Sequence, residues 1–469
     1  MRKTKIICTL GPATDREGVL EELMRSGMDC ARFNFSHGTH ADQKARMDRV
    51  KELRKKMGLY TPILLDTKGP EIRLSVLPEG SRELHAGQAF TFYADGREGD
   101  EAGAGISYPH LAEALRPGDR VLVDDGRLGF TVEEIRGGDL LCRVENDWTL
   151  KSRKSLNIPN VEIPQPYLSD ADRSDLLFGI EQEVDFVAAS FVRRGEDVRL
   201  LRTFLDENGG KDIPIIAKIE NRSGVQNADE ILALADGIMV ARGDMGVEIP
   251  FPELPAIQKD LIDRCYRAGK IVVTATQMLE SMVHTPRPTR AEVSDIANAI
   301  YDGTSAIMLS GEVAAGDYPV ESLRTMAEIA ETTEKSIDYK KLYLQNDLEL
   351  GEDVPNAIAN SAVLAALNLE AAAIVAVTRT GATARTVAAF RPGCPVIAPC
   401  MDPRVQRRMN LVWGVYPIAC REVSSPADFF DLAVEKALAS GLTHKGDRIV
   451  LVASVRGLTS SDMVHVETV

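Results

Sequence analysis

Short runs of hydrophobic residues alternate with longer amphipathic segments along the first two thirds of the chain. The segments at 17–27 and 251–269 have the hydrophobic spacing of an α-helix, whereas the short runs are typical of buried strands. Eight runs are expected to be strands: 5–10, 29–35, 62–69, 184–191, 214–221, 237–244, 270–277 and 304–312. Eight repeated β–α units predict a (β/α)8 TIM barrel.

The series of β–α units is interrupted once, after the third run. The segment that follows has short alternating runs and turn signals, as in VLVDDGRLGFTVEEI, which predict an all-β insertion. Past residue 340 the β–α pattern restarts and predicts a separate open α/β domain. We therefore predict four segments: 1–69, the first part of the barrel; 70–160, an inserted β lid; 161–340, the second part of the barrel; and 341–469, a C-terminal α/β domain.

The composition of the chain limits the kinds of molecule that the protein can be expected to bind. The length of 469 residues fits about three domains. A net charge of −15 argues against a nucleic acid or an anionic membrane as partner, because both need basic patches. The seven cysteines form no C-x-x-C pair, which is typical of reduced thiols, so we expect a cytoplasmic protein. No run is long enough to span a bilayer.

Polar side chains gather at the C-terminal ends of the predicted barrel strands, where barrel enzymes carry their catalytic groups. Lys218 and Glu220 share one face of a strand, because strand side chains alternate. Asp244 ends the next strand, so the two carboxylates should be neighbours. With no His or Cys beside them, they suit Mg²⁺ or Mn²⁺ better than zinc. Arg32 and Lys218 add positive charge suited to a phosphorylated substrate.

A purely structural role for these charges is the alternative. Lys218–Glu220 and Arg242–Asp244 could be ion pairs that fill polar layers of the barrel. Five polar strand ends in one acidic protein favour a functional site instead. The sequence has neither G-x-x-x-x-G-K-[ST] nor G-x-G-x-x-G after a strand, so a nucleotide would be bound without either motif.

Longer motifs resemble the pyruvate kinase family in its bacterial form. They occur in the family order: TKIICTLGPAT, RFNFSHG, LLDTKGPEIR, IIAKIENRSG, IMVARGDMGVEIP, TATQMLESM, PTRAEVSDIANAIYDGTSAIMLSGE and GDYPVE. The resemblance covers essentially the whole chain and implies a mobile lid, a C-terminal effector domain and a homotetramer. The implied reaction is the last step of glycolysis, in which phosphoenolpyruvate and ADP give pyruvate and ATP, with Mg²⁺ (or Mn²⁺) and K⁺.

The resemblance also implies roles for residues that contact the substrate. Lys218 would neutralise the transferring phosphoryl group and the enolate, and Arg32 would bind the phosphoryl group. The backbone N–H groups of Gly243 and Asp244 would hold the substrate carboxylate. Thr276 would belong to a water-linked relay that protonates the enolate, since a Thr hydroxyl is too weak an acid to act alone.

The resemblance assigns two cation sites and a nucleotide site. Glu220 and Asp244 would bind the divalent ion. The oxygens expected to bind K⁺ belong to Asn34, Ser36, Asp66 and Thr67. Relatives with Lys at the position of Glu71 dispense with K⁺, so Glu71 predicts that this chain needs it. The residues expected to face ADP or ATP are Asn34, Phe35, Ser36, His37, Arg73 and Lys154.

The motif VTRTGATART in the C-terminal domain ends a strand and opens a helix, where an anion can bind. The resemblance places an effector phosphate at Thr378, Arg379, Thr380 and Thr383. Plain N-capping by Thr380 or Thr383 is the alternative. The tail from residue 453 is short for this family, which leaves fructose 1,6-bisphosphate, another sugar phosphate or no effector open.

Two other functions compete with the pyruvate kinase reaction. Another metal-enolate barrel enzyme, acting on pyruvate or phosphoenolpyruvate, would explain Lys218, Glu220 and Asp244, but not the inserted lid or Lys154. A catalytically inactive sensor of sugar phosphates would not need the intact metal and lysine positions.

Overall fold

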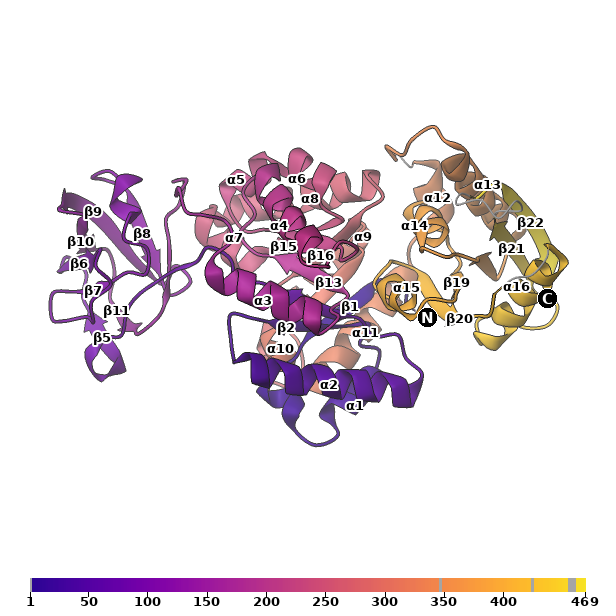
Figure 1. Cartoon of the computed structure of the whole chain (residues 1–469), viewed down its shortest axis with the longest axis horizontal. Coiled ribbons are helices and arrows are strands. Elements are labelled where there is room, and N and C mark those ends of the chain that lie inside the picture. The colour runs from indigo at the N-terminus through magenta and orange to yellow at the C-terminus, as the bar shows by residue number, and fades with distance from the viewer. Residues whose placement is uncertain (1, 346–347, 423–425, 454–460) are drawn as a thin grey trace.

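The computed structural model describes residues 2–345, 348–422, 426–453 and 461–469, arranged as three bodies in a row (Figure 1). A small β-rich body lies at one end, a barrel surrounded by helices lies in the middle, and an α/β body lies at the other end. The fold class predicted from the sequence is confirmed. No helix among the described residues is long and apolar enough to cross a membrane.

Eight parallel strands close the central barrel in the order β1-β17-β16-β15-β14-β13-β3-β2. Each of the eight predicted runs supplies one strand: β1 (Lys5–Thr9), β2 (Cys30–Asn34), β3 (Ile63–Asp66), β13 (Phe186–Ala189), β14 (Ile215–Ile219), β15 (Gly237–Ala241), β16 (Ile271–Ala275) and β17 (Ala306–Leu309). Nearly every residue of these strands is buried, because the barrel interior covers one face and the outer helices cover the other.

Helices surround the barrel and bury their apolar faces against it. They are α1 (Val19–Arg25), α2 (His40–Met57), α3 (Asp170–Glu181), α4 (Gly195–Glu207), α5 (Arg222–Gln226), α6 (Ala228–Leu234), α7 (Arg242–Glu248), α8 (Leu254–Arg267), α9 (Arg290–Tyr301), α10 (Gly311–Ala314) and α11 (Pro319–Lys335). Their ends follow local signals in the sequence. In α2, for example, Thr39 and Asp42 form a capping box, and Gly58 ends the helix in the left-handed conformation.

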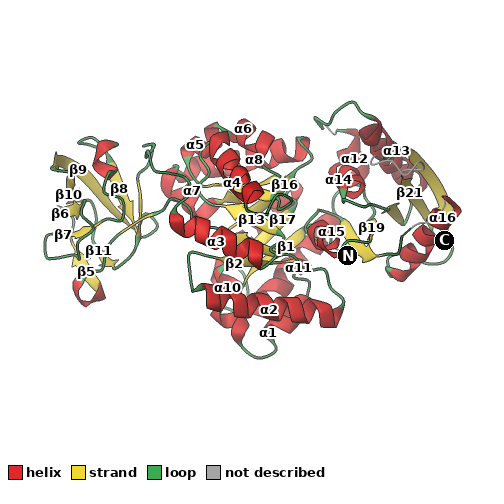
Figure 2. Cartoon of the chain, in the orientation of Figure 1, coloured by secondary structure: helices red, strands yellow, loops and turns green. Residues whose placement is uncertain are grey.

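The inserted body, called the lid below, consists mainly of strands and loops (Figure 2). Its main sheet has the order β4-β12-β8-β9-β10-β6-β7, and β5 pairs with β11. The strands are β4 (Ile72–Arg73), β5 (Ser81–Leu84), β6 (Ala89–Tyr93), β7 (Gly103–Gly105), β8 (Arg120–Val123), β9 (Leu128–Arg136), β10 (Asp139–Val144), β11 (Trp148–Lys151) and β12 (Ser155–Asn157). In its own core, the ring of Phe92 packs in T-shaped contacts with the rings of Phe90 and Phe130.

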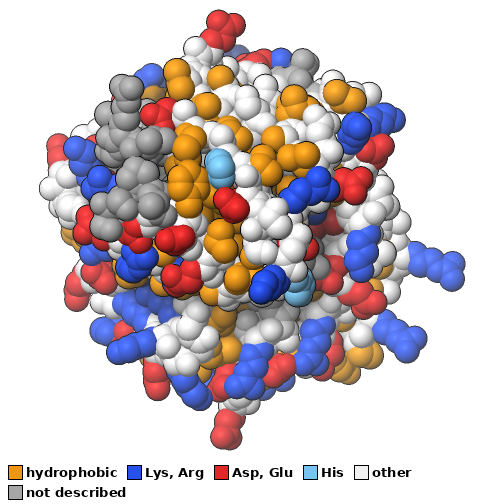
Figure 3. All heavy atoms as spheres, turned by 90° about the vertical axis from the view of Figure 1, so that its right-hand side faces the viewer, with side chains coloured by type: hydrophobic (Ala, Val, Ile, Leu, Met, Phe, Trp, Pro, Cys, Tyr) orange, Lys and Arg blue, Asp and Glu red, His pale blue; other side chains and the backbone are white. Residues whose placement is uncertain are grey.

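The C-terminal body is a five-stranded sheet in the order β20-β19-β18-β21-β22, with helices on both faces. Its elements are α12 (Tyr339–Leu344), α13 (Val354–Leu369), β18 (Ala373–Ala376), α14 (Ala382–Ala389), β19 (Val396–Cys400), α15 (Pro403–Met409), β20 (Val415–Ala419), α16 (Pro426–Ala439), β21 (Arg448–Ala453) and β22 (Met463–Thr468). The β–α pattern does not predict β22, because this last strand runs antiparallel to β21 and needs no crossover helix. Seen end-on, this body shows a strip of hydrophobic side chains among mixed charges (Figure 3).

The C-terminal body docks against the end of the barrel where the strands begin. Arg407 on α15 pairs with the buried Asp185, just before β13, at 2.7 Å. Lys5 at the start of β1 donates to the carbonyl oxygen of Val415 at 2.7 Å. The C-terminal body therefore lies at the opposite end of the barrel from the polar strand ends. The exact domain boundaries at 69/70, 160/161 and 340/341 stay predictions.

Candidate active site

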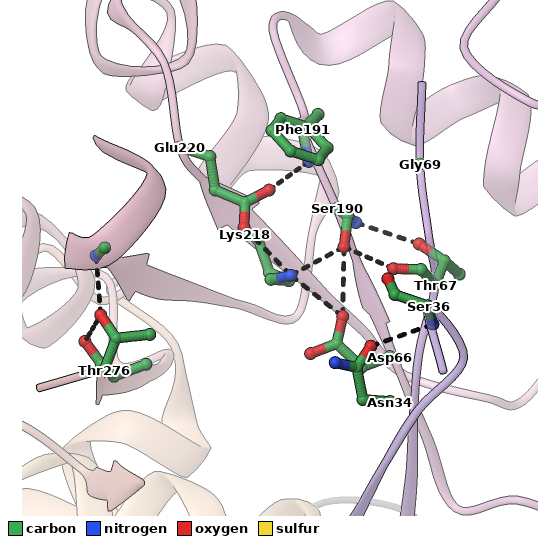
Figure 4. Close-up of polar contacts among 12 residues, drawn as sticks. Asn34, Ser36, Asp66, Thr67, Gly69, Ser190, Phe191, Lys218, Glu220 and Thr276 are labelled. Atoms are coloured by element: carbon green, nitrogen blue, oxygen red, sulfur yellow. Dashed lines mark hydrogen bonds and ion pairs between the residues drawn. The ribbon is translucent and has the colours of Figure 1, made fainter. Parts of the chain in front are cut away.

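Lys218 on β14 is the centre of a buried polar network at the mouth of the barrel (Figure 4). Its Nζ lies 3.0 Å from Asp66 Oδ1 and 3.0 Å from Glu220 Oε1, and it donates to Ser190 Oγ at 2.7 Å. Only 8% of Lys218 is exposed. Burial alone would lower the pKa of Lys218, but the charges of Asp66 and Glu220 overcome this effect and raise it above its usual range. The ammonium group is therefore permanently charged and fixed in position.

Arg32 on β2 joins the same network through Asp66. Its Nε donates to Asp66 Oδ2 at 2.6 Å, and its Nη1 donates to Thr9 Oγ1 at 2.8 Å. Asp66 is fully buried, and although burial favours its neutral form, Arg32 and Lys218 hold its pKa below the usual range. The remaining nitrogen of Arg32, Nη2, donates to no residue in the described part of the chain, so it is free to bind a ligand oxygen.

Glu220 and Asp244 lie together, as their positions on consecutive strands predict. Glu220 is 0% exposed; its Oε2 accepts from the Phe191 N–H at 2.6 Å, and its Oε1 makes the 3.0 Å ion pair with Lys218 Nζ. Burial raises the pKa of Glu220, and the neighbouring Asp244 raises it further, against the opposing effect of Lys218. The pKa of Asp244 is also raised, chiefly by burial. The positive charge of Lys218 therefore compensates only part of the negative charge that these two carboxylates would carry together.

This carboxylate pair fits a hard divalent cation. Both groups offer oxygen ligands, and the buried Glu220 Oε1 has an ion pair with Lys218 but no well-aligned hydrogen bond among the described residues. Within the described ranges, no group of three or more His, Cys, Asp and Glu side chains is arranged to hold a metal ion. An ion held by Glu220 and Asp244 would therefore take its other ligands from water or substrate.

Thr276 follows β16 in an unusual backbone conformation. Its φ of +68° is a strained value for a β-branched residue, and such strain concentrates at functional sites. Its Oγ1 accepts from the Gly243 N–H at 2.7 Å and donates to the Ala275 carbonyl oxygen at 2.6 Å. The Gly243 N–H thus donates to Thr276, although we expected it to face a substrate carboxylate. The same hydrogen bond places Thr276 beside the first turn of α7.

The four residues expected to bind K⁺ come from two neighbouring strand ends and lie close together (Figure 4). Oxygens of three of them, Asn34, Asp66 and Thr67, already accept hydrogen bonds. Asn34 Oδ1 accepts from the Ser36 N–H at 3.1 Å, and the Thr67 carbonyl oxygen accepts from Ser190 Oγ at 2.6 Å. Asp66 faces Arg32 and Lys218. The oxygen chemistry suits K⁺, but binding would require these hydrogen bonds to be shared or rearranged.

A cavity of about 490 Å³ lies between the lid and the barrel mouth. Glu71 and the returning strand β12 line it from the lid side, and Asp244 lines it from the barrel side. Arg73 and Lys154, the lid cations predicted to meet a nucleotide, do not line this cavity, and each is paired with a carboxylate. Arg73 Nε donates to Glu71 at 2.8 Å, and Lys154 Nζ lies 2.6 Å from Asp124.

Residues 34–37 form a turn that leaves the barrel mouth, and their side chains point in different directions. Phe35 is buried and packs against the rings of His40 and Phe178, so it does not point to the mouth. The side chain of His37 is exposed, and partial desolvation together with the nearby Arg73 lowers its pKa. Of the expected nucleotide contacts here, Phe35 could act only through its backbone.

The predicted effector loop precedes α14. Thr378 Oγ1 accepts from the Gly381 N–H at 2.9 Å, and Thr380 Oγ1 accepts from the Ala382 N–H at 3.4 Å. Thr383 instead shares a 2.7 Å hydrogen bond with Ser461. The N-cap of α14 is Gly381, so neither Thr380 nor Thr383 caps this helix from the N-cap position. Residues 454–460 of the short tail lie outside the described residues.

Family models for two parts of pyruvate kinase match this chain. The model described as "Pyruvate kinase, barrel domain" matches residues 1–323, and "Pyruvate kinase, alpha/beta domain" matches residues 356–467. The chain belongs to the pyruvate kinase family. Pyruvate kinases of Clostridium acetobutylicum and Clostridium perfringens are 47% and 48% identical to it, each over 97% of this chain and 96% of the relative. A crystal structure of a pyruvate kinase from Cryptosporidium parvum matches at a TM-score of 0.94 with 39% identity, covering 100% of this chain and 96% of that one.

Membership of the pyruvate kinase family confirms the predicted family and enzyme class. Pyruvate kinases are phosphotransferases and generally use a divalent metal ion and K⁺. Nothing in the comparisons supports the other metal-enolate enzyme or the inactive sensor.

Two residues of the barrel mouth are missing from the set that the sequence predicts. Ser190 follows β13 and accepts a hydrogen bond from Lys218 Nζ. Thr9 ends β1 and accepts a hydrogen bond from Arg32 Nη1. Both are hydroxyl residues at strand ends, the same signal that identifies Thr276. Applying the strand-end rule to all eight strands would have found them.

Proposed function

We propose that this member of the pyruvate kinase family transfers the phosphoryl group of phosphoenolpyruvate to ADP at the mouth of its barrel, giving pyruvate and ATP. One observation carries the proposal: the buried amino group of Lys218 lies 3.0 Å from Glu220 Oε1 at strand ends that also carry Arg32 and Asp244. Such a cluster offers positive charge to a phosphoryl group and carboxylates to a divalent ion.

Lys218 would stabilise charge that develops during transfer. The bond between phosphorus and the enol oxygen breaks, its electron pair stays on that oxygen, and an oxygen of the ADP β-phosphate bonds to phosphorus. The transition state is metaphosphate-like, with charge on the equatorial oxygens. An ammonium group already fixed by Asp66 and Ser190 needs no reorganisation to stabilise this charge or the enolate. Arg32 would bind the phosphoryl group through its free Nη2.

Glu220 and Asp244 would hold Mg²⁺ or Mn²⁺, and Asn34, Ser36, Asp66 and Thr67 would hold K⁺. When bound, the divalent ion supplies positive charge to the phosphoryl and enolate oxygens. The raised pKa values of Glu220 and Asp244 support its place, because a cation beside them would offset the cost of burying both charges.

Thr276 would orient the water that protonates the enolate. Its Oγ1 is held between the Gly243 N–H and the Ala275 carbonyl, so the hydroxyl cannot turn freely. A Thr hydroxyl is too weak an acid to give up its own proton, so its role is to position a proton donor. The substrate carboxylate would lie near the N-terminus of α7 and accept a hydrogen bond from the Asp244 N–H. It would also accept one from the Gly243 N–H once that group no longer donates to Thr276.

Lid closure would complete the nucleotide site. Arg73 and Lys154 sit on the lid strand β4 and beside β12, and closure over the 490 Å³ cavity would bring them to the nucleotide phosphates. Each would exchange its carboxylate partner, Glu71 or Asp124, for phosphate oxygens. Asn34, Ser36, His37 and the backbone of Phe35 would form the facing side.

The loop before α14 would bind the phosphate of an effector through Thr378, Arg379, Thr380 and Thr383. Thr383→Glu should then abolish activation by sugar phosphates, because it adds a negative charge in the first turn of the helix. A wild-type enzyme that responds to no sugar phosphate would leave local hydrogen bonding as the sole role of these residues. The homotetramer and the cytoplasmic location stay predictions.

Pyruvate formation from phosphoenolpyruvate, measured with and without ADP, tests the proposed reaction. Phosphoryl transfer predicts pyruvate and ATP in equal amounts, and neither without ADP. Pyruvate release without ADP would identify a different enzyme acting on phosphoenolpyruvate, and no pyruvate at all would indicate an inactive protein.

A further inference from the structure

Arg242 is the first residue of α7 and directly precedes Gly243 and Asp244, whose N–H groups are expected to bind the substrate carboxylate. The carboxylate that pairs with Arg242 is Asp295 on α9, which lies 2.6 Å from Nη1. Its partner is therefore not Asp244, as a purely structural ion pair would require. The side chain of Arg242 is only 13% exposed, so it is held firmly beside the barrel mouth.

Arg242 also binds the backbone where β16 ends. Its Nε donates to the carbonyl oxygens of Ala275 and Thr276, each at 3.2 Å, and its Nη2 donates to the Thr276 carbonyl oxygen at 2.6 Å. Backbone carbonyl groups that are shielded from water need such donors. One guanidinium group thereby joins the start of α7 to two successive carbonyl groups on the neighbouring strand end.

The backbone that Arg242 binds has an unusual conformation. Thr276 and Gln277 both have a positive φ, of +68° and +55°. Two consecutive non-glycine residues in this region are strained, and such a turn persists only where surrounding contacts hold it. The hydrogen bond from the Gly243 N–H to Thr276 Oγ1, at 2.7 Å, is one such contact (Figure 4). Thr276 is therefore tied to the start of α7 twice, through its hydroxyl by Gly243 and through its carbonyl group by Arg242.

We propose that Arg242 is a positioning residue for the protonation of the enolate, because it fixes the Thr276 hydroxyl relative to Gly243 and Asp244. This inference rests on the proposed function, in which Thr276 orients the proton donor and the start of α7 binds the substrate carboxylate. One side chain would then set the distance between two groups that act on the same substrate. A misplacement of about 1 Å in such a pair can cost about a hundredfold in rate.

The contacts of Arg242 require the shape of a guanidinium group as well as its charge. Its planar fork donates to Asp295 and to the carbonyl groups of β16 at the same time, whereas a lysine ammonium is a point donor on a flexible stem. Arg242→Lys therefore keeps a positive charge beside Asp295 but should lose contacts to the carbonyl groups. Asp295→Asn removes the ion pair and leaves the guanidinium group in place. The two variants separate the ion pair from the carbonyl contacts.

Steady-state kinetics of the full-length protein in H2O and D2O test the role. Arg242→Gln and Arg242→Lys should each lower kcat by about tenfold or more and change KM for phosphoenolpyruvate less. The solvent deuterium isotope effect on kcat should increase, because protonation of the enolate then limits turnover. Asp295→Asn should lower kcat less than either change at Arg242.

Arg202→Gln is the matched control. Arg202 on α4 also donates to two backbone carbonyl groups, those of Lys211 and Ile213, and to the carboxylate of Asp206. Its contacts lie just before β14, at the end of the barrel opposite the mouth. Arg202→Gln should therefore leave kcat and the isotope effect as they are in the wild type.

A double variant distinguishes positioning of Thr276 from general stabilisation. If Arg242 acts through Thr276, Arg242→Gln should lower kcat much less in a Thr276→Ala protein than in the wild type. Equal losses in the two backgrounds, with an unchanged isotope effect, would show that Arg242 only stabilises the fold and would overturn the role. If Arg242→Gln does not fold, Arg242→Lys supplies the same comparison.

Failure of this role and failure of the proposed function give different results. A wild-type protein that makes no pyruvate from phosphoenolpyruvate and ADP would refute the proposed function and the role of Arg242 together. An active wild type whose kcat and isotope effect are unchanged in both Arg242 variants would refute the role of Arg242 alone.

Discussion

The two ends of the barrel treat buried cations in opposite ways. At the mouth, Lys218 and Arg32 are each paired with carboxylates at 3.0 Å or less. These cations do not fully compensate the negative charge there, because Glu220 and Asp244 still have raised pKa values. At the opposite end, Arg385 and Arg408 have no carboxylate partner among the described residues. The cations at the mouth are therefore held by opposite charge, whereas these two arginines are held without an ion pair in the described part of the chain.

Removing the paired cation at the mouth should have the largest effect. Lys218→Met should lower kcat by about 10³-fold or more and change KM far less, because the ammonium acts mainly on charge that develops in the transition state. Lys445→Met, an exposed lysine in the C-terminal body, is the control. Steady-state kinetics that show a raised KM with an unchanged kcat would contradict this role.

Removing K⁺ should have the next largest effect. With Mg²⁺ saturating, replacing K⁺ by tetramethylammonium at constant ionic strength should strongly reduce turnover and exclude simple screening as the cause. Glu71→Lys should reduce the dependence on K⁺, since it places a positive charge beside the mouth. Full turnover in tetramethylammonium would refute both the K⁺ site and the role given to Glu71.

Ser190 should act as a positioning residue, with a smaller effect. It accepts from Lys218 at 2.7 Å and donates to the Thr67 carbonyl oxygen at 2.6 Å, so Ser190→Ala frees both groups. Loss of one hydrogen bond to a charged group predicts a decrease in kcat of about tenfold. Ser190→Thr keeps the hydroxyl and should restore most of the rate. Equal rates for Ser190→Ala and Ser190→Thr would show that the hydroxyl is not needed.

The pH dependence of stability should show the smallest effect. Burial raises the pKa of Glu220 above its usual range, so the folded protein binds a proton more tightly than the unfolded chain. The contribution of Glu220 to the free energy of unfolding should therefore fall as pH rises from the ordinary carboxyl range through the raised pKa. Urea unfolding in a chelator should show this fall in the wild type and less of it in Glu220→Gln. Parallel pH profiles for the two proteins would contradict the raised pKa.

Much of the barrel and its mouth could be predicted from the sequence because the signals are local. Each strand is a continuous apolar run, and each polar strand end follows it directly, as in Lys218 and Glu220. Contacts between distant segments leave no such signal. The hydrogen bond from the Gly243 N–H to Thr276 Oγ1 depends on a positive φ at Thr276. The cavity between the barrel and the C-terminal body brings together Lys270, Arg385 and Arg408, which come from segments with no common motif.

Binding of Mn²⁺, followed by electron paramagnetic resonance, tests most directly whether the mouth carboxylates hold the divalent ion. The wild-type protein should bind one Mn²⁺ per chain at this site, and Glu220→Gln should weaken that binding by about tenfold or more, because it removes one charged ligand. Glu133→Gln, on the exposed surface of the lid, is the matched control and should bind Mn²⁺ as the wild type does. Equal Mn²⁺ affinity in the wild type and in Glu220→Gln would contradict the account.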